Sequence, residues 1–133
     1  MKQFLLDTNI VIYILNGDPY FVESLNKFKD ASFFISIATW IEALAGSLRH
    51  GKSVDELTED LSSLPRLQLD EKVGRTAALL IQNNIKRRQK RNFQDSVIAA
   101  TAIAHNMPLI TNDEKDFRQF KGLKIMSPRW RKS

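Results

Sequence analysis

Residues 4–11 of this chain read Phe4-Leu5-Leu6-Asp7-Thr8-Asn9-Ile10-Val11, and this stretch decides the fold class. Three apolar residues in a row indicate a short buried strand, which Asp7 ends. The residues that follow begin a helix whose apolar side chains lie mainly on one side. A buried strand that leads directly into a helix is the first part of a parallel βα unit.

The same alternation continues along the chain. Further strands are expected at residues 33–37, 66–69, 108–111 and 123–126, the last as an edge strand. Helices are expected at residues 8–15, 20–28 and 113–120, and others are expected to start at Thr39, Ser53, Asp70 and Asp95. We predict one α/β domain over residues 1–133, with a central, mostly parallel sheet of four to five strands covered on both faces. Residues 127–133 either belong to it or form a loose basic tail.

The helix expected from Thr39 carries an apolar stripe. Its members repeat at helical spacing and indicate the buried face: Ile37, Ile41, Leu44, Ala45 and Leu48. Trp40 lies off this stripe, where it is either part of an exposed contact surface or packed under a neighbouring loop.

Composition excludes several classes of protein. The chain has 133 residues and no cysteine, which rules out a disulfide framework, a thiolate zinc site and a cysteine nucleophile. No stretch approaches the ~20 apolar residues of a membrane helix, so we expect a cytoplasmic protein without membrane contact. The net charge of +5 suits a polyanionic ligand, although ordinary solubility charges would give the same balance.

Four acids stand where a strand ends or a helix begins: Asp7, Glu42, Asp95 and Asp113. The carboxyl ends of parallel strands meet at one edge of a sheet, so these side chains are expected to converge there. Carboxylates that share a pocket repel each other unless a cation neutralises them, and Mg²⁺ prefers oxygen ligands. The sequence therefore predicts a carboxylate-lined metal site.

Each of these acids also has a simpler interpretation. Aspartate at a helix start is a common N-cap, and Glu42 would also fit at the solvated margin of an apolar stripe. Asp116, one turn after Asp113, is either a further ligand or an exposed acid beside Lys115. Nearby polar residues could orient the acids or could only form caps and turns: Thr8, Asn9, Thr39, Thr111 and Asn112.

Four motifs in this order resemble the PIN-domain family. The resemblance spans residues 4 to about 120 and is carried by Leu5-Leu6-Asp7-Thr8-Asn9-Ile10, by Ile35-Ser36 through Thr39 with Glu42-Ala43-Leu44 to Gly46, by Phe93-Gln94-Asp95-Ser96-Val97-Ile98-Ala99-Ala100-Thr101-Ala102, and by Leu109-Ile110-Thr111-Asn112-Asp113-Glu114-Lys115-Asp116-Phe117. The compact length resembles the VapC-type toxins of toxin–antitoxin pairs.

The resemblance implies a fold, an activity and partners. The fold is an α/β/α sandwich, and the activity is that of a Mg²⁺- or Mn²⁺-dependent endoribonuclease. The partners are RNA, a second copy in a homodimer, and a small VapB-type antitoxin whose tail enters the active-site groove. By motif position Asp7, Glu42 and Asp95 carry over as metal-site acids; the fourth acid is Asp113 or Asp116, with Asp113 ranked first.

A basic run precedes the third motif and is the candidate RNA-binding segment: Lys86, Arg87, Arg88, Lys90 and Arg91. Its side chains would bind RNA phosphates beside the acids, although basic residues also suit a solvated helix C-terminus. Many family members have a loop with Gly or Pro where this chain has Lys90-Arg91-Asn92. His50 and His105 are not expected to be catalytic.

Two other functions fit parts of this sequence. One is a non-catalytic nucleic-acid-binding or regulatory module on the same fold, against which the complete set of acids argues. The other is a phosphotransfer enzyme with Asp7 as nucleophile, which would need a second acid close by where the chain has Asn9. The RNA target, the number of metal ions and the identity of the antitoxin cannot be read from the sequence.

Overall fold

A parallel sheet of five strands forms the centre of the molecule. The computed structural model describes residues 2–28, 30–48, 51–88 and 92–128. The strands are β1 (Lys2–Leu6), β2 (Ala31–Ser36), β3 (Arg66–Leu67), β4 (Leu109–Ile110) and β5 (Ile125–Met126). They lie in the order β3-β2-β1-β4-β5, and every pairing in the described sheet is parallel. The predicted sheet is confirmed, with the last strand at an edge.

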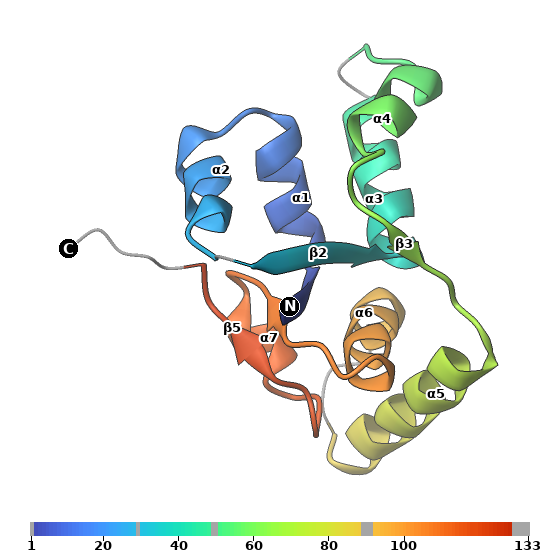
Figure 1. Ribbon diagram of the computed structural model, residues 1–133. Helices are drawn as coiled ribbons and strands as arrows, with labels where there is room; N and C mark the ends of the chain where they lie inside the picture. The colour runs from blue at the N-terminus through green and yellow to red at the C-terminus, as the bar shows by residue number, and fades with distance from the viewer. Residues whose placement is uncertain (1, 29, 49–50, 89–91, 129–133) are drawn as a thin grey trace.

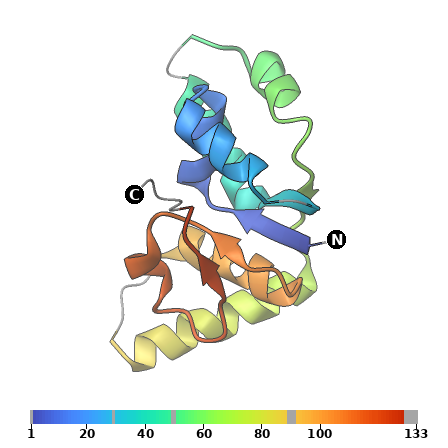
Figure 2. The ribbon, with the colours of Figure 1, turned by 60° about the vertical axis from the view of Figure 1, so that its left-hand side comes forward.

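Helices cover both faces of this sheet. They are α1 (Thr8–Leu15), α2 (Pro19–Asn26), α3 (Ile37–Leu48), α4 (Val54–Asp60), α5 (Glu71–Lys86), α6 (Phe93–Ala104) and α7 (Glu114–Phe117). In Figure 1 helices α1 to α4 lie above the sheet and α5 and α6 below it. Figure 2 shows the same layers from another side, with α5 and α6 opposite α1 and α2. The α/β/α sandwich is confirmed.

Strand β1 connects the two halves of the core. Its side chains alternate between the faces of the sheet: Leu5 packs in the core beneath α5 and α6, whereas Phe4 and Leu6 pack in the core beneath α1 and α3. Leu5 and Leu6 are both fully buried. A strand covered on both faces needs a continuous apolar run, which explains why residues 4–6 predicted β1 correctly.

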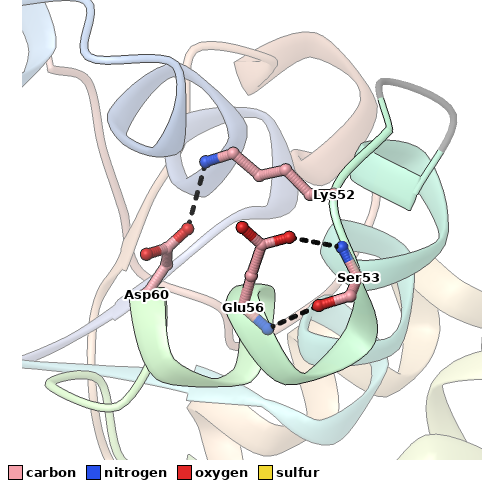
Figure 3. A network of polar contacts seen from close by, with 4 residues as sticks. All are labelled: Lys52, Ser53, Glu56 and Asp60. Carbon is pink, nitrogen blue, oxygen red and sulfur yellow. Dashed lines mark hydrogen bonds and ion pairs between the residues drawn. The ribbon is translucent and has the colours of Figure 1, made fainter.

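Helix ends on the outer layer are closed by local caps. Ser53 and Glu56 form a capping box at the start of α4, in which the Ser53 hydroxyl accepts the Glu56 N–H at 3.1 Å and the Glu56 carboxylate accepts the Ser53 N–H at 2.9 Å (Figure 3). An ion pair of 3.1 Å between Lys52 and Asp60 spans the same helix. Asp70 caps α5 by accepting the N–H of Val73 at 3.0 Å. Both caps begin their helices where the sequence predicted.

The buried face of α3 differs from the predicted stripe. The structure buries Thr39, Ala43 and Ser47, while Ile41 is 54% and Leu48 41% exposed. Small side chains therefore form the buried face of α3, and two of its large apolar residues lie on the exposed side. Helical spacing alone could not distinguish these faces, because both repeat every three to four residues.

Trp40 takes the packed alternative. It is partly buried against the core beneath α1 and α3, and the guanidinium of Arg66 lies 4.6 Å from its ring centroid. Near the C-terminus, Pro128 is buried and its carbonyl accepts the Tyr20 hydroxyl at 3.4 Å. Residues 129–133 of the predicted tail lie outside the described residues. In the described part of the chain no helix has the length and apolarity needed to cross a membrane.

Substituting Leu5 tests the packing of β1. Leu5→Ala should lower the free energy of unfolding by about 2–5 kcal/mol, because it removes buried methyl groups and leaves a cavity. Ile41→Ala removes a similar aliphatic side chain from an exposed position and should cost about 0.5 kcal/mol or less. Urea denaturation of the two variants measures both values. An equal cost at the two positions would contradict the outward orientation of Ile41.

Candidate active site

The acids converge at the carboxyl edge of the sheet, around the place where the strand order reverses. The chain runs from β1 outward through β2 to β3, then returns to place β4 on the other side of β1. In open parallel sheets this reversal leaves a crevice in which ligands bind. Asp7 directly follows β1, and the loop after β4 carries Thr111 and Asp113 on the other side of the crevice.

Asp7 is the most buried acid, at 5% exposure. One carboxylate oxygen accepts the Thr8 N–H at 2.7 Å and so caps α1, and the other accepts the Thr111 hydroxyl at 2.7 Å. Burial raises the pKa of Asp7 from 3.8 to about 6; the two hydrogen bonds oppose this rise, and the negative charges of Asp113 and Glu42 add to it. Asp7 is therefore both the predicted cap and a member of a charge cluster.

Glu42 reaches the edge from the second turn of α3. The Thr8 hydroxyl donates to its carboxylate at 2.6 Å and lies 3.1 Å from the Thr39 hydroxyl. The Thr39 N–H in turn donates to the hydroxyl of Ser36 at 3.0 Å. Glu42 is half-buried and tied to Thr8 by this hydrogen bond, so its carboxylate is oriented at the edge even though it stands at the margin of the buried face of α3.

Asp95 lies in the first turn of α6 and is not its cap. The helix begins at Phe93, and Asn92 caps it by accepting the Asp95 N–H at 2.9 Å. The prediction that Asp95 starts this helix was wrong, because an asparagine three residues earlier is an equally good cap. The shift leaves the Asp95 carboxylate free to face the other acids.

The pKa of Asp95 reports how the acids are grouped. Partial burial, the largest cause, and the negative charges of Asp7, Glu42, Asp116 and Asp113 together raise this pKa from 3.8 to about 6. Asp95 thus lies within electrostatic reach of all four other acids. Asp113 acts on both Asp7 and Asp95, whereas Asp116 is a cause only for Asp95. The choice between Asp113 and Asp116 as fourth ligand stays a prediction.

Threonines hold the acids in place. Thr111 donates to Asp7 and also accepts the Asp113 N–H at 2.9 Å, so one hydroxyl joins the loop after β4 to the end of β1. The Thr8 hydroxyl donates to Glu42 and so joins the start of α1 to α3. Asn9 and Asn112 are exposed, and their predicted orienting role stays a prediction.

Ser36 and Asn92 are the positioning residues that the sequence interpretation missed. Both carry the side-chain oxygen that typifies an N-cap, three residues before Thr39 and Asp95. That spacing was the available signal for the true starts of α3 and α6.

The donor set fits a hard divalent cation by its chemistry. It consists of carboxylate oxygens, the ligands that Mg²⁺ and Mn²⁺ take. As the side chains stand, no three acidic or histidine side chains in the described ranges are grouped closely enough to hold one ion. Repulsion between like charges favours such spreading, so binding would require the carboxylates to draw together.

The basic run is described only in part. Lys86, Arg87 and Arg88 are exposed where α5 ends, while Lys90 and Arg91 lie outside the described residues. His105 follows the last residue of α6 and Asp95 lies in the first turn, so the two are at opposite ends of the helix. His50 is also outside the described residues.

Comparisons with known proteins agree with this architecture. The PIN domain family model matches residues 4–123. The chain is similar to the structure of VapBC2 from Rickettsia felis bound to a promoter DNA fragment, with 24% identity, a TM-score of 0.82 and coverage of 94% of this chain and 98% of that chain. It is also similar to a toxin–antitoxin complex from Klebsiella pneumoniae, with 26% identity, a TM-score of 0.76 and coverage of 94% of this chain and 97% of that chain. FitAcB from Neisseria gonorrhoeae is similar with 24% identity, a TM-score of 0.80 and coverage of 96% of this chain and 99% of that chain. No curated protein matched.

The raised pKa values predict how stability depends on pH. Because Asp7 and Asp95 have a higher pKa in the folded than in the unfolded chain, the folded state binds more protons between about pH 4 and 6. In EDTA, the free energy of unfolding of the wild type should therefore fall as pH rises through this window. Asp7→Asn should remove a part of the fall on the order of 2 kcal/mol, and Asp95→Asn a smaller part.

Urea denaturation at pH 4, 5, 6 and 7 measures this dependence. Glu71→Gln, which changes an exposed acid on α5, is the matched control and should retain the full fall. A wild-type stability that rises from pH 4 to 7, with Asp7→Asn parallel to it, would show that the acids are not clustered as described.

Proposed function

The chain belongs to the PIN domain family, and we propose that it is a metal-dependent endoribonuclease that acts as the toxin of a type II toxin–antitoxin pair. The observation that carries this proposal is the gathering of five acids from four separate segments at one edge of the sheet, with Asp113 and Asp116 on the same segment. Burying Asp7 and Asp95 among other negative charges raises their pKa to about 6. Such a cluster is unfavourable unless it serves a cation.

The proposed metal ligands are Asp7, Glu42, Asp95 and Asp113, with Asp116 as the alternative fourth acid. When bound, Mg²⁺ or Mn²⁺ supplies an activated water and neutralises charge on the phosphate. The reaction is hydrolysis, in which water adds across one P–O bond of the RNA backbone. The carboxylate donors support a hard divalent cation at this site.

The chain's own residues would do the positioning. Thr111 and Thr8 fix the carboxylates of Asp7 and Glu42 with hydrogen bonds of 2.7 and 2.6 Å, so these two acids keep a constant orientation when substrate arrives. Losing such a supporting hydrogen bond typically costs ten- to 100-fold in metal affinity or activity. The substrate is a polyanion, and a chain with a net charge of +5 attracts it.

A protein partner is part of this proposal. The similar structures from Rickettsia felis and Klebsiella pneumoniae are a VapBC complex and a toxin–antitoxin complex. By analogy with them we propose a small VapB-type antitoxin that blocks the acidic edge, and a homodimer of this chain as the family expectation. The cytoplasm, where such RNA is found, is the proposed location.

Total cellular RNA provides the first test of activity. The wild type with Mg²⁺ or Mn²⁺ should yield discrete fragments whose ends can be mapped. Asp7→Asn and Asp95→Asn should each reduce the cleavage rate by at least about 100-fold, a larger loss than removing a supporting hydrogen bond. EDTA should abolish cleavage. Asparagine keeps the size of each side chain and, at position 7, an oxygen that can still cap α1.

Glu71→Gln serves again as the control and should cleave like the wild type. Circular dichroism would verify that every variant is folded. If folded wild type leaves RNA intact with either metal, free of any bound protein, the nuclease is refuted. The non-catalytic nucleic-acid-binding module would then be the better interpretation of this fold.

Metal binding can be tested without activity. Mn²⁺ at pH 7 should raise the thermal midpoint of the wild type, because a ligand that binds only the folded state stabilises it. The same ion should also relieve repulsion among the acids. Asp95→Asn should lose most of this increase, and Glu71→Gln should keep it. Differential scanning calorimetry with and without Mn²⁺ measures the effect, and equal increases in all three proteins would place the ion elsewhere.

A further inference from the structure

We propose that a pocket beside the acidic edge binds an unpaired nucleotide of the RNA strand, next to the phosphate that is cut. This inference rests on the proposed ribonuclease function and adds to it a binding subsite for the nucleotide next to the phosphate that is cut. The pocket has a volume of about 460 Å³, within the range of small-ligand sites. It is lined by residues of α2 and of the segment that contains α7, together with residues 127 and 128.

The pocket and the acids share one wall. Along residues 111–116, Thr111 bonds Asp7, whereas Asn112 and Lys115 line the pocket. The negative charges of the two acids on the same segment, Asp113 and Asp116, raise the pKa of Asp95. A strand whose phosphate lies at the acids would therefore pass over this wall, and its neighbouring nucleotide would reach the pocket.

The side of the pocket formed by α2 is aromatic. Tyr20 is 40% exposed and presents a ring on which a base can stack. Its hydroxyl makes a long hydrogen bond of 3.4 Å to the carbonyl of Pro128. Phe21 lies beside it and is itself stacked on Tyr13, with centroids 4.3 Å apart. This side is therefore formed in advance of binding, which reduces the entropy lost on stacking.

The opposite side of the pocket is cationic. Lys115 is exposed, and the Arg118 side chain, 71% exposed, pairs with Glu114 at 3.6 Å. A guanidinium carries five N–H donors, so this single contact leaves donors for a phosphate. Lys115 and Arg118 against Glu114 leave the lining with one excess positive charge.

These features favour nucleic acid over a protein segment as the occupant. A peptide helix needs an apolar groove for its anchors, whereas this pocket combines exposed cations and an amide with one aromatic side. They also favour an unpaired strand, because a base can stack on a protein ring only after leaving its own stack.

Binding of a short, unstructured, fluorescently labelled RNA in EDTA tests the pocket without cleavage. By fluorescence anisotropy, Tyr20→Ala should weaken binding at least about fivefold, the lower end for loss of one stacked base. Tyr20→Phe keeps the ring and should change affinity less than about twofold. Neither variant should alter binding to a duplex of the same sequence, whose bases stay stacked.

The cations are tested with a matched pair. Lys115→Ala combined with Arg118→Ala should weaken RNA binding about tenfold and reduce the slope of log Kd against log salt by about 0.7 for each lost phosphate contact. Arg75→Ala is the control, because Arg75 is 79% exposed and pairs with an acid at the same helical spacing, Glu71 at 3.8 Å. It should change the affinity less than about twofold and leave the slope intact.

The outcomes separate this inference from the nuclease itself. RNA bound through the pocket but never cut with Mg²⁺ or Mn²⁺ would refute the nuclease and keep the site. RNA cut by the wild type but bound equally well by every pocket variant would overturn the site and keep the nuclease. A pocket variant that loses a co-expressed protein partner, with its RNA affinity unchanged, would assign the pocket to protein recognition and also overturn the inference.

Discussion

The parallel pairing of β1 with both β2 and β4 is the constraint on which the rest of the structure depends. Leu5 is in register with Phe34 on one side and with Leu109 on the other. Because all strands run the same way, their carboxyl ends lie along one edge and every following loop or helix begins there. The acids can therefore meet at that edge although they are far apart in the sequence.

The site works against the stability of the fold that holds it. Asp7 is 5% exposed and has other negative charges nearby, so its ionised form is disfavoured and its pKa rises to about 6. Neighbouring threonines offset part of this cost, since Thr111 and the Thr8 N–H donate to its two oxygens. The apolar cores on both faces of the sheet supply the remaining stability. An unfavourable charge cluster of this kind persists only because the well-packed cores around it hold its residues in place.

Charge is distributed in two zones at this edge. The acids gather at the carboxyl edge of the sheet and influence one another electrostatically, and Lys115 and Arg118 line the pocket that shares the segment after β4. Such an arrangement attracts a polyanion without placing cations among the carboxylates, where they would compete with a metal ion. The segment after β4 serves both zones, because its Asp113 and Asp116 influence the other acids electrostatically while its Asn112, Lys115 and Arg118 line the pocket.

The sequence by itself determined the features that depend on neighbouring residues. The apolar run at residues 4–6, the caps at Ser53 and Asp70, and the position of Asp7 after a buried strand were all predicted correctly, because each depends on local propensity and hydrogen bonding. The alternation of strands and helices predicted a parallel sheet covered on both faces for the same reason, and the PIN resemblance implied the α/β/α sandwich. The PIN resemblance placed the acids on matching motifs.

Only the tertiary structure decided how these parts meet. It placed β4 beside β1, so that Thr111 bonds a carboxylate far away in sequence, and it turned Ile41 outward although its spacing fitted the buried stripe. It also brought α2 against the segment after β4 to form the aromatic and cationic pocket. Periodicity describes each helix or strand separately, whereas burial depends on which faces fit most closely together. Which face of a helix fits best is therefore decided only when all the helices and strands pack together.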